Sequence, residues 1–188
     1  MKEYSVLLVD DEEDVVEAII QKIDWGGLGY SLLGYAKNGL EALEIAEEKQ
    51  VDVVLTDIKM PYMDGLTLSH KLKELYPSVK IIIFSGFDEF EYAKEAIRLE
   101  AEEYMLKPVD SVELSRIFKK VHERLDEEFD EKQNINRLKN YYMESLPILQ
   151  ESFYTSLIEG NVRQEDMERT MLDYQITLPG KLYCVVVL

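Results

Sequence analysis

The chain has 188 residues, of which 46% are hydrophobic, so it can bury the core of at least one domain. Its 38 acidic residues outnumber its 21 basic residues, and a net charge of −17 repels nucleic-acid phosphates, which argues against DNA binding by these residues. The single cysteine, Cys184, excludes an intramolecular disulfide, and no apolar run approaches the roughly 20 residues of a membrane-spanning helix, so we expect a cytoplasmic protein.

Strand and helix patterns alternate along the first 122 residues. The strands are short apolar runs without strict alternation, which is typical of strands buried on both faces. Predicted strands cover residues 4–9, 30–36, 51–56, 80–84 and 103–106. Predicted helices cover residues 14–23, 38–46, 65–75 and 88–99, and a last one begins near residue 112 after a cap at Asp110. Five such βα repeats predict an α/β fold with a doubly wound, five-stranded parallel sheet.

The pattern changes after residue 122. Residues 123–145 predict a helical linker, with apolar positions at Ile135, Leu138 and Tyr142 that suggest a coiled-coil-like connector. Pro147 fits the first turn of a new helix, and residues 181–188 predict a strand. We therefore expect three parts: a domain over 1–122, the linker over 123–145, and a partial α+β segment over 146–188. Because the chain stops inside a predicted strand, the last part is expected to be the start of a second, truncated domain.

Chemically useful side chains follow four of the five predicted strands. Asp10 and Asp11 follow the first strand, Asp57 the third, Ser85 the fourth and Lys107 the fifth. The carboxyl ends of parallel strands meet at one edge of a sheet, so these groups should converge there. Clustered carboxylates repel one another unless a cation joins them, and hard oxygen ligands suit Mg²⁺. A metal, a hydroxyl and an ammonium group around one carboxylate predict a site for phosphoryl transfer.

Each of these residues alone also has an ordinary structural explanation. Asp10 can cap a helix, Ser85 can form a turn, Lys107 can lie on the surface and Tyr104 can belong to the core. The acidic run from Glu12 to Asp14 favours the amino end of a helix. Only the combination at the ends of neighbouring strands points to a functional site.

The pattern resembles the receiver domain of two-component response regulators. The resemblance rests on Asp10-Asp11-Glu12, on Asp57 with the motif from Met60 to Gly65, on Ser85-Gly86 and on Tyr104 shortly before Lys107-Pro108. It covers about residues 1–122 and implies the flavodoxin-like receiver fold. The one departure is small, because the family often has Thr where Ser85 stands.

The resemblance also implies a role for each site residue. Asp57 is expected to be the phosphoacceptor, and Asp10, Asp11, Asp57 and the Lys59 carbonyl are expected to bind Mg²⁺. Lys107 is expected to bind the phosphoryl group, through a cis peptide bond to Pro108. Ser85 and Tyr104 are expected to form the switch pair.

Residues 85–93 resemble more narrowly the YesN-like branch, whose members usually end in an AraC-type helix-turn-helix. The implied function is a two-component response regulator that accepts a phosphoryl group from a sensor histidine kinase. A homodimer is left open, and DNA would be bound only through a helix-turn-helix that these 188 residues lack.

Three other functions fit the sequence less well. A phosphohydrolase with an aspartyl-phosphate intermediate needs a second Asp two residues after the nucleophile, where Lys59 stands. A nucleotide-binding module needs a glycine-rich turn after the first strand, where the acidic run from Asp10 to Asp14 would repel phosphates. A receiver-like interaction domain that works without phosphate stays open, although the intact set of site residues disfavours it.

Overall fold

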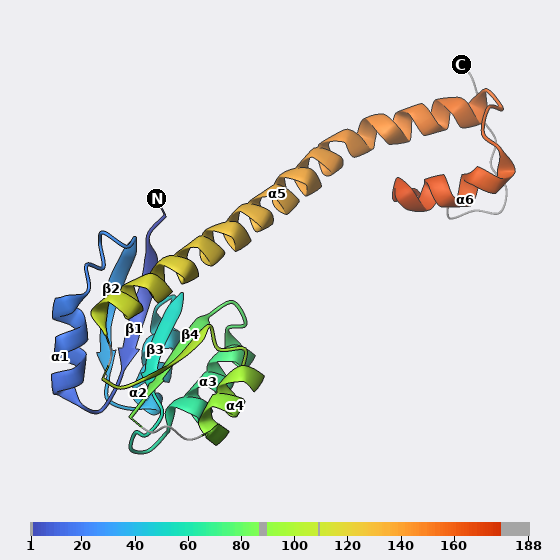
Figure 1. The fold of residues 1–188 in the computed structure, drawn as a ribbon. Helices are drawn as coiled ribbons and strands as arrows, with labels where there is room; N and C mark the ends of the chain where they lie inside the picture. The colour runs from blue at the N-terminus through green and yellow to red at the C-terminus, as the bar shows by residue number, and fades with distance from the viewer. Residues whose placement is uncertain (1, 87–89, 109, 178–188) are drawn as a thin grey trace. The chain divides into compact units, whose positions relative to one another are not determined.

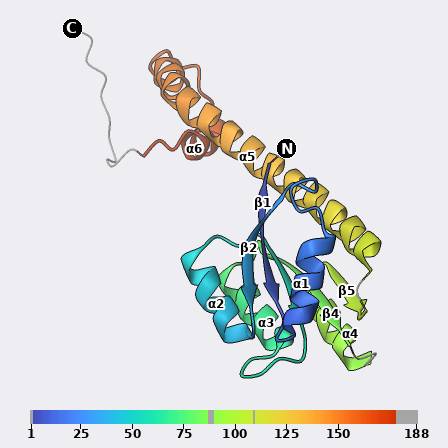
Figure 2. The same ribbon diagram turned by 90° about the vertical axis from the view of Figure 1, so that its left-hand side faces the viewer.

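The structure, a computed structural model, describes residues 2–86, 90–108 and 110–177. The chain forms two compact units that divide between Glu128 and Phe129. The first unit is a five-stranded parallel sheet in the order β2-β1-β3-β4-β5 with helices on both faces, as predicted (Figures 1 and 2). Its strands are β1 (Tyr4–Val9), β2 (Tyr30–Ala36), β3 (Val53–Asp57), β4 (Lys80–Ser85) and β5 (Glu103–Leu106). The helices are α1 (Glu13–Lys22), α2 (Gly39–Glu48), α3 (Gly65–Leu75), α4 (Phe90–Arg98), α5 (Ser111–Ile158) and α6 (Gln164–Asp173).

The central strands are apolar throughout because both of their faces are covered. In β1, Val6 and Leu8 pack into a core that includes Phe118 of α5, whereas Leu7 and Val9 pack into a second core with side chains of α2 and α3. Every residue of β3 and β4 is buried. The sheet is thus sandwiched between α1 and α5 on one face and α2, α3 and α4 on the other.

The strand order places β1 beside β3, at the point where the winding of the chain reverses. Val9 pairs with Thr56 in the parallel register, so the residues that follow, Asp10 and Asp57, leave the sheet side by side. Open α/β sheets bind ligands in the crevice beyond such a reversal point. The fold therefore provides a crevice at the edge where the sequence predicts a site.

Helix α5 differs from the prediction in its length. It begins as expected, because the backbone N–H of Val112 donates a 2.9 Å hydrogen bond to Oδ1 of Asp110. It then continues unbroken to Ile158, so the predicted start of a new helix at Pro147 is wrong. Proline in a helix interior removes one backbone hydrogen bond, here the one to the carbonyl of Met143, and need not end the helix. The boundaries at residues 122 and 145 stay a prediction.

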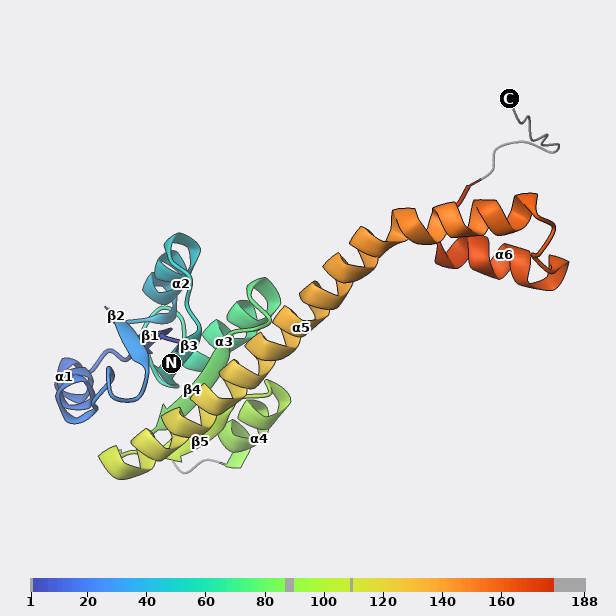
Figure 3. The same cartoon turned by 90° about the horizontal axis from the view of Figure 1, so that it is seen from above.

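In the second unit, α6 runs alongside the last turns of α5 (Figure 3). The rings of Phe153 and Tyr174 meet edge to face at 6.3 Å, and Gln150 Nε2 donates a 2.9 Å hydrogen bond to the carbonyl of Tyr174. The described part of this unit is helical. The predicted strand at 181–188, and with it Cys184, lies outside the described residues. Within the described ranges, no helix combines the length and the apolar character that crossing a membrane requires.

Candidate functional site

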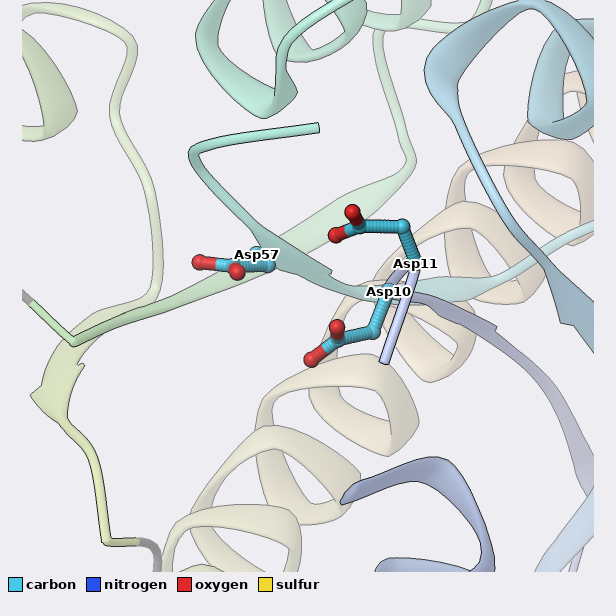
Figure 4. Close-up of side chains that lie close together, drawn as sticks. All are labelled: Asp10, Asp11 and Asp57. Carbon is cyan, nitrogen blue, oxygen red and sulfur yellow. The ribbon is translucent and has the colours of Figure 1, made fainter. Parts of the chain in front are cut away.

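Three carboxylates converge at the carboxyl ends of β1 and β3. Asp10, Asp11 and Asp57 each place one carboxylate oxygen within 4.8 Å of the other two (Figure 4). Asp10 and Asp57 are buried, whereas Asp11 is exposed to solvent. The predicted clustering of these residues is confirmed, and such a set of hard oxygen atoms is suited to a divalent cation.

Lys107 supplies the positive charge of the site. Its Nζ lies 2.9 Å from Asp10 Oδ2, from Glu12 Oε1 and from Asp57 Oδ2. Burial would lower the pKa of Lys107, but hydrogen bonds to these carboxylates outweigh burial and raise the pKa above its ordinary value. Lys107 therefore stays an ammonium group. The peptide bond between Lys107 and Pro108 is cis, as predicted.

Asp10 carries a charge that its surroundings satisfy only in part. The carboxylate is fully buried, and burial raises its pKa above the usual value. Its Oδ1 accepts a 2.8 Å hydrogen bond from the backbone N–H of Glu12. Its Oδ2 touches the Lys107 ammonium but accepts no well-directed hydrogen bond within the described part of the chain. A buried carboxylate oxygen with unused lone pairs beside two further carboxylates fits a metal ligand.

The backbone around Asp57 is held by its neighbours. Oδ1 of Asp57 accepts a 2.6 Å hydrogen bond from the N–H of Ile58, which leaves Oδ2 facing Lys107. The hydroxyl of Thr56 donates to the carbonyl of Asp57 at 2.8 Å. Gly65 packs directly on this carbonyl, because a Cβ at Gly65 would lie 1.9 Å from the carbonyl oxygen. The orientation of Asp57 thus depends on a glycine at the start of α3.

The expected switch pair lies on β4 and β5, the two strands that follow β3 in the sheet. Ser85 pairs with Leu106 and Ile83 pairs with Tyr104, so Ser85 and Tyr104 are two positions out of register on the same face of the sheet. Ser85 is fully buried, and Tyr104 is half-buried against the core formed with α2 and α3. Lys59 is exposed and lines a cleft of about 560 Å³ together with Asp11. The structure therefore brings Asp10, Asp11, Asp57 and Lys107 together, with Ser85 at the carboxyl end of β4 and Tyr104 two positions farther back on β5.

Two residues of the site were missed by sequence reasoning. Glu12 was assigned to the amino end of a helix, but its side chain makes no capping hydrogen bond and instead binds Lys107. The sequence pattern predicts Gly65 only as the start of the helix over 65–75, although it lies against Asp57. A glycine where α3 begins was a signal for close backbone approach, whereas the sequence carried no signal for the Glu12 contact.

A sequence model of the response regulator receiver domain matches residues 6–119. The chain is 47% identical over 111 residues to the uncharacterized transcriptional regulatory protein YesN of Bacillus subtilis, a match that covers 59% of this chain and 30% of YesN. It is 32% identical over 164 residues to the transcriptional regulatory protein HptR of Staphylococcus aureus, covering 86% of this chain and 64% of HptR. The chain thus spans less than two thirds of both relatives.

The chain is also similar to solved structures of response regulators. The REC domain of AraT, a response regulator from Geobacillus stearothermophilus, superimposes with a TM-score of 0.63 at 43% identity, covering 66% of this chain and 97% of that domain. A two-component transcriptional regulator AraC from Clostridium phytofermentans gives a TM-score of 0.60 at 35% identity, covering 64% of this chain and 93% of that one. Both likenesses span about two thirds of the chain.

Proposed function

This chain belongs to the response regulator receiver family, and from that premise we propose that Asp57 accepts a phosphoryl group from a histidine kinase in a Mg²⁺-dependent reaction. The observation that carries the proposal is the contact between Lys107 Nζ and Asp57 Oδ2 at 2.9 Å, in a crevice where three carboxylates converge. A carboxylate beside a fixed ammonium group is arranged to attack a phosphoryl group whose negative oxygens the ammonium can bind.

In the proposed reaction, one carboxylate oxygen of Asp57 forms a bond to phosphorus. The bond between phosphorus and the donor breaks, and its electron pair leaves with the donor, which is the imidazole of a phosphohistidine in the kinase. The N–H of Ile58 holds Oδ1, and Lys107, already beside Oδ2, binds the phosphoryl oxygens. Asp10, Asp11, Asp57 and the Lys59 carbonyl would hold Mg²⁺, and the charge of the ion would offset further negative charge on the phosphoryl group.

Phosphorylation is proposed to change the conformation through Ser85 and Tyr104. The Ser85 hydroxyl can turn toward a phosphoryl oxygen, and the half-buried Tyr104 ring can move into the space this opens, because packed interiors tolerate voids poorly. Tyr104 lies on β5, directly before the loop into α5. Since α5 continues beyond the first unit, the change has a covalent route to the rest of the chain.

The output is proposed to be transcriptional control. YesN and HptR are transcriptional regulatory proteins, and this chain spans only part of their length. DNA binding is therefore assigned to a helix-turn-helix domain outside these 188 residues. A histidine kinase as partner, a homodimer as active form and a cytoplasmic location belong to the same proposal.

Residues 6–119 match the receiver domain, and we propose that this domain accepts a phosphoryl group and does not act as an enzyme on another substrate. The direct test of the proposal is the intact mass of the protein after treatment with acetyl phosphate and Mg²⁺. We expect the mass of one added phosphoryl group, and no such addition when the metal is chelated. A protein that gains no phosphoryl group under either condition would support the phosphate-independent alternative.

A further inference from the structure

Glu12 stands at the start of α1, yet its side chain reaches the loop that follows β5. Its Oε1 accepts a 2.9 Å hydrogen bond from Lys107 Nζ, although the two residues are 95 positions apart in the sequence. The side chain makes no capping hydrogen bond to its own helix. The carboxylate of Glu12 therefore binds Lys107 and does not cap α1.

Lys107 is closely surrounded by acidic oxygens. Three carboxylate oxygens lie 2.9 Å from Nζ, which donates hydrogen bonds to Glu12 and Asp57 and is in ionic contact with Asp10. A phosphoryl oxygen that approaches Lys107 therefore competes with these carboxylates for the ammonium group. Glu12 is the carboxylate that can move away most easily, because its side chain is 61% exposed. The side chains of Asp10 and Asp57 are only 0% and 8% exposed.

The surroundings of Glu12 leave room for it to move. Glu12 and Lys107 both line a cavity of about 370 Å³ between α1 and α5. A partly exposed carboxylate that rotates away from Lys107 regains water as its partner, so the cost of breaking the contact is small. The same movement from Asp10 would leave a charge buried without a partner, which is costly.

We propose that Glu12 is a positioning residue that holds Lys107 in the resting state and releases it when a phosphoryl group arrives. This inference rests on the function proposed above and adds a regulation of the same site. Glu12 competes with the phosphoryl oxygens for one N–H of Lys107, and its charge repels the anionic donor. Weakening the contact should therefore make the resting protein bind a phosphoryl donor more readily.

The test uses the Glu12→Gln variant of the full chain with acetyl phosphate and excess Mg²⁺. A neutral amide oxygen accepts a weaker hydrogen bond from an ammonium group than a carboxylate does. We expect the acetyl phosphate concentration for half-maximal phosphorylation rate to fall about two- to fivefold, the range of an exposed ion pair, with the maximal rate nearly unchanged. Intact-mass measurements over time give both quantities.

Glu13→Gln is the matched control. Glu13 is the next residue along the chain and is exposed to a similar degree, but its carboxylate pairs with Lys37 Nζ at 2.5 Å. This variant makes the same change of charge without touching Lys107, and it should behave as the parent. Glu12→Asp is the second variant, because it keeps the charge while its shorter side chain loses the contact. If the contact matters, Glu12→Asp also lowers the half-maximal concentration.

The outcomes separate the inference from the function on which it rests. A lower half-maximal concentration in both Glu12 variants, but not in Glu13→Gln, supports the inference. Equal shifts in Glu12→Gln and Glu13→Gln would show a general effect of charge and overturn it. Unchanged or slower phosphorylation of Glu12→Gln overturns it as well, while the parent's own phosphorylation keeps the proposed function intact. If the parent accepts no phosphoryl group, both the inference and the proposed function are wrong.

Discussion

The hydroxyl of Tyr4 donates a 2.8 Å hydrogen bond to Oδ1 of Asp126, which joins the first strand of the sheet to α5 beyond residue 122. Two further contacts hold the same stretch of α5. Lys80 Nζ, at the start of β4, lies 2.5 Å from Glu128 Oε1, and Arg124 pairs with Glu102. The first unit of the fold therefore uses residues 123–128 as part of its own structure.

A fragment of residues 1–128 should consequently be more stable than one of residues 1–122. The shorter fragment loses the burial of Leu125 and the hydrogen bond of Tyr4. We expect it to unfold cooperatively, but with a free energy of unfolding lower by about 2–4 kcal/mol. Urea denaturation of both fragments measures the difference. Equal stabilities would show that the contacts beyond residue 122 contribute nothing.

Gly65→Ala should disturb Asp57 without touching its side chain. The new Cβ would lie 1.9 Å from the Asp57 carbonyl oxygen, so the backbone must shift. We expect a loss of about 1–3 kcal/mol in stability and slower phosphorylation. Gly26→Ala is the control, because a Cβ there meets nothing within 4 Å. Thermal melts and intact mass report the two effects, and a Gly65→Ala variant that matches the parent in both would contradict the geometry.

Asp11→Asn should raise the Mg²⁺ concentration that phosphorylation requires. The substitution removes a charged oxygen from the acidic cluster, and hard cations bind charged oxygen ligands best. We expect an increase of about tenfold, as removal of one strong ligand contact implies, measured by titrating Mg²⁺ at fixed acetyl phosphate. Glu17→Gln, an exposed position on α1, serves as the control. An unchanged requirement in Asp11→Asn would place the metal elsewhere.

Asp10→Asn should stabilise the metal-free protein at neutral pH. Burial raises the pKa of Asp10, so the folded protein binds its proton more tightly than the unfolded chain does. The ionised carboxylate therefore costs stability above its folded pKa, and this cost disappears as the pH falls and Asp10 is protonated. The gain in Asp10→Asn should accordingly shrink toward acidic pH. Melting temperatures of both proteins, measured in chelator across the pH range, test this prediction. A stability gain of Asp10→Asn that grows on acidification would contradict it.

Ser85→Ala should accept a phosphoryl group on Asp57 but fail to transmit the change. Without the hydroxyl, nothing draws residue 85 toward the phosphoryl oxygens, so Tyr104 keeps its place. Hydrogen exchange of β5 and sedimentation, each measured before and after phosphorylation, should change in the parent and not in the variant. If the variant responds as the parent does, the route does not pass through this pair. Asp57→Ala, which should gain no phosphoryl group, is the control for both measurements.

The sequence by itself determined the sheet and the membership of the site. Buried strands can be recognised in the sequence as short apolar runs. The residues that follow them must meet at one edge of a parallel sheet. For this reason Asp10, Asp11, Asp57, Ser85 and Lys107 could be placed together before their positions were known. These inferences need only local patterns and one rule of topology.

Only the tertiary structure decided which partners the side chains take. Glu12 binds Lys107, Tyr4 binds Asp126 and Gly65 packs on Asp57, and none of these contacts follows from a periodic pattern. Pro147 shows the same limit, because local preference predicted a new helix where α5 in fact continues. Residues far apart in the chain meet through the packing of whole elements, and that packing selects among partners that local sequence leaves equivalent.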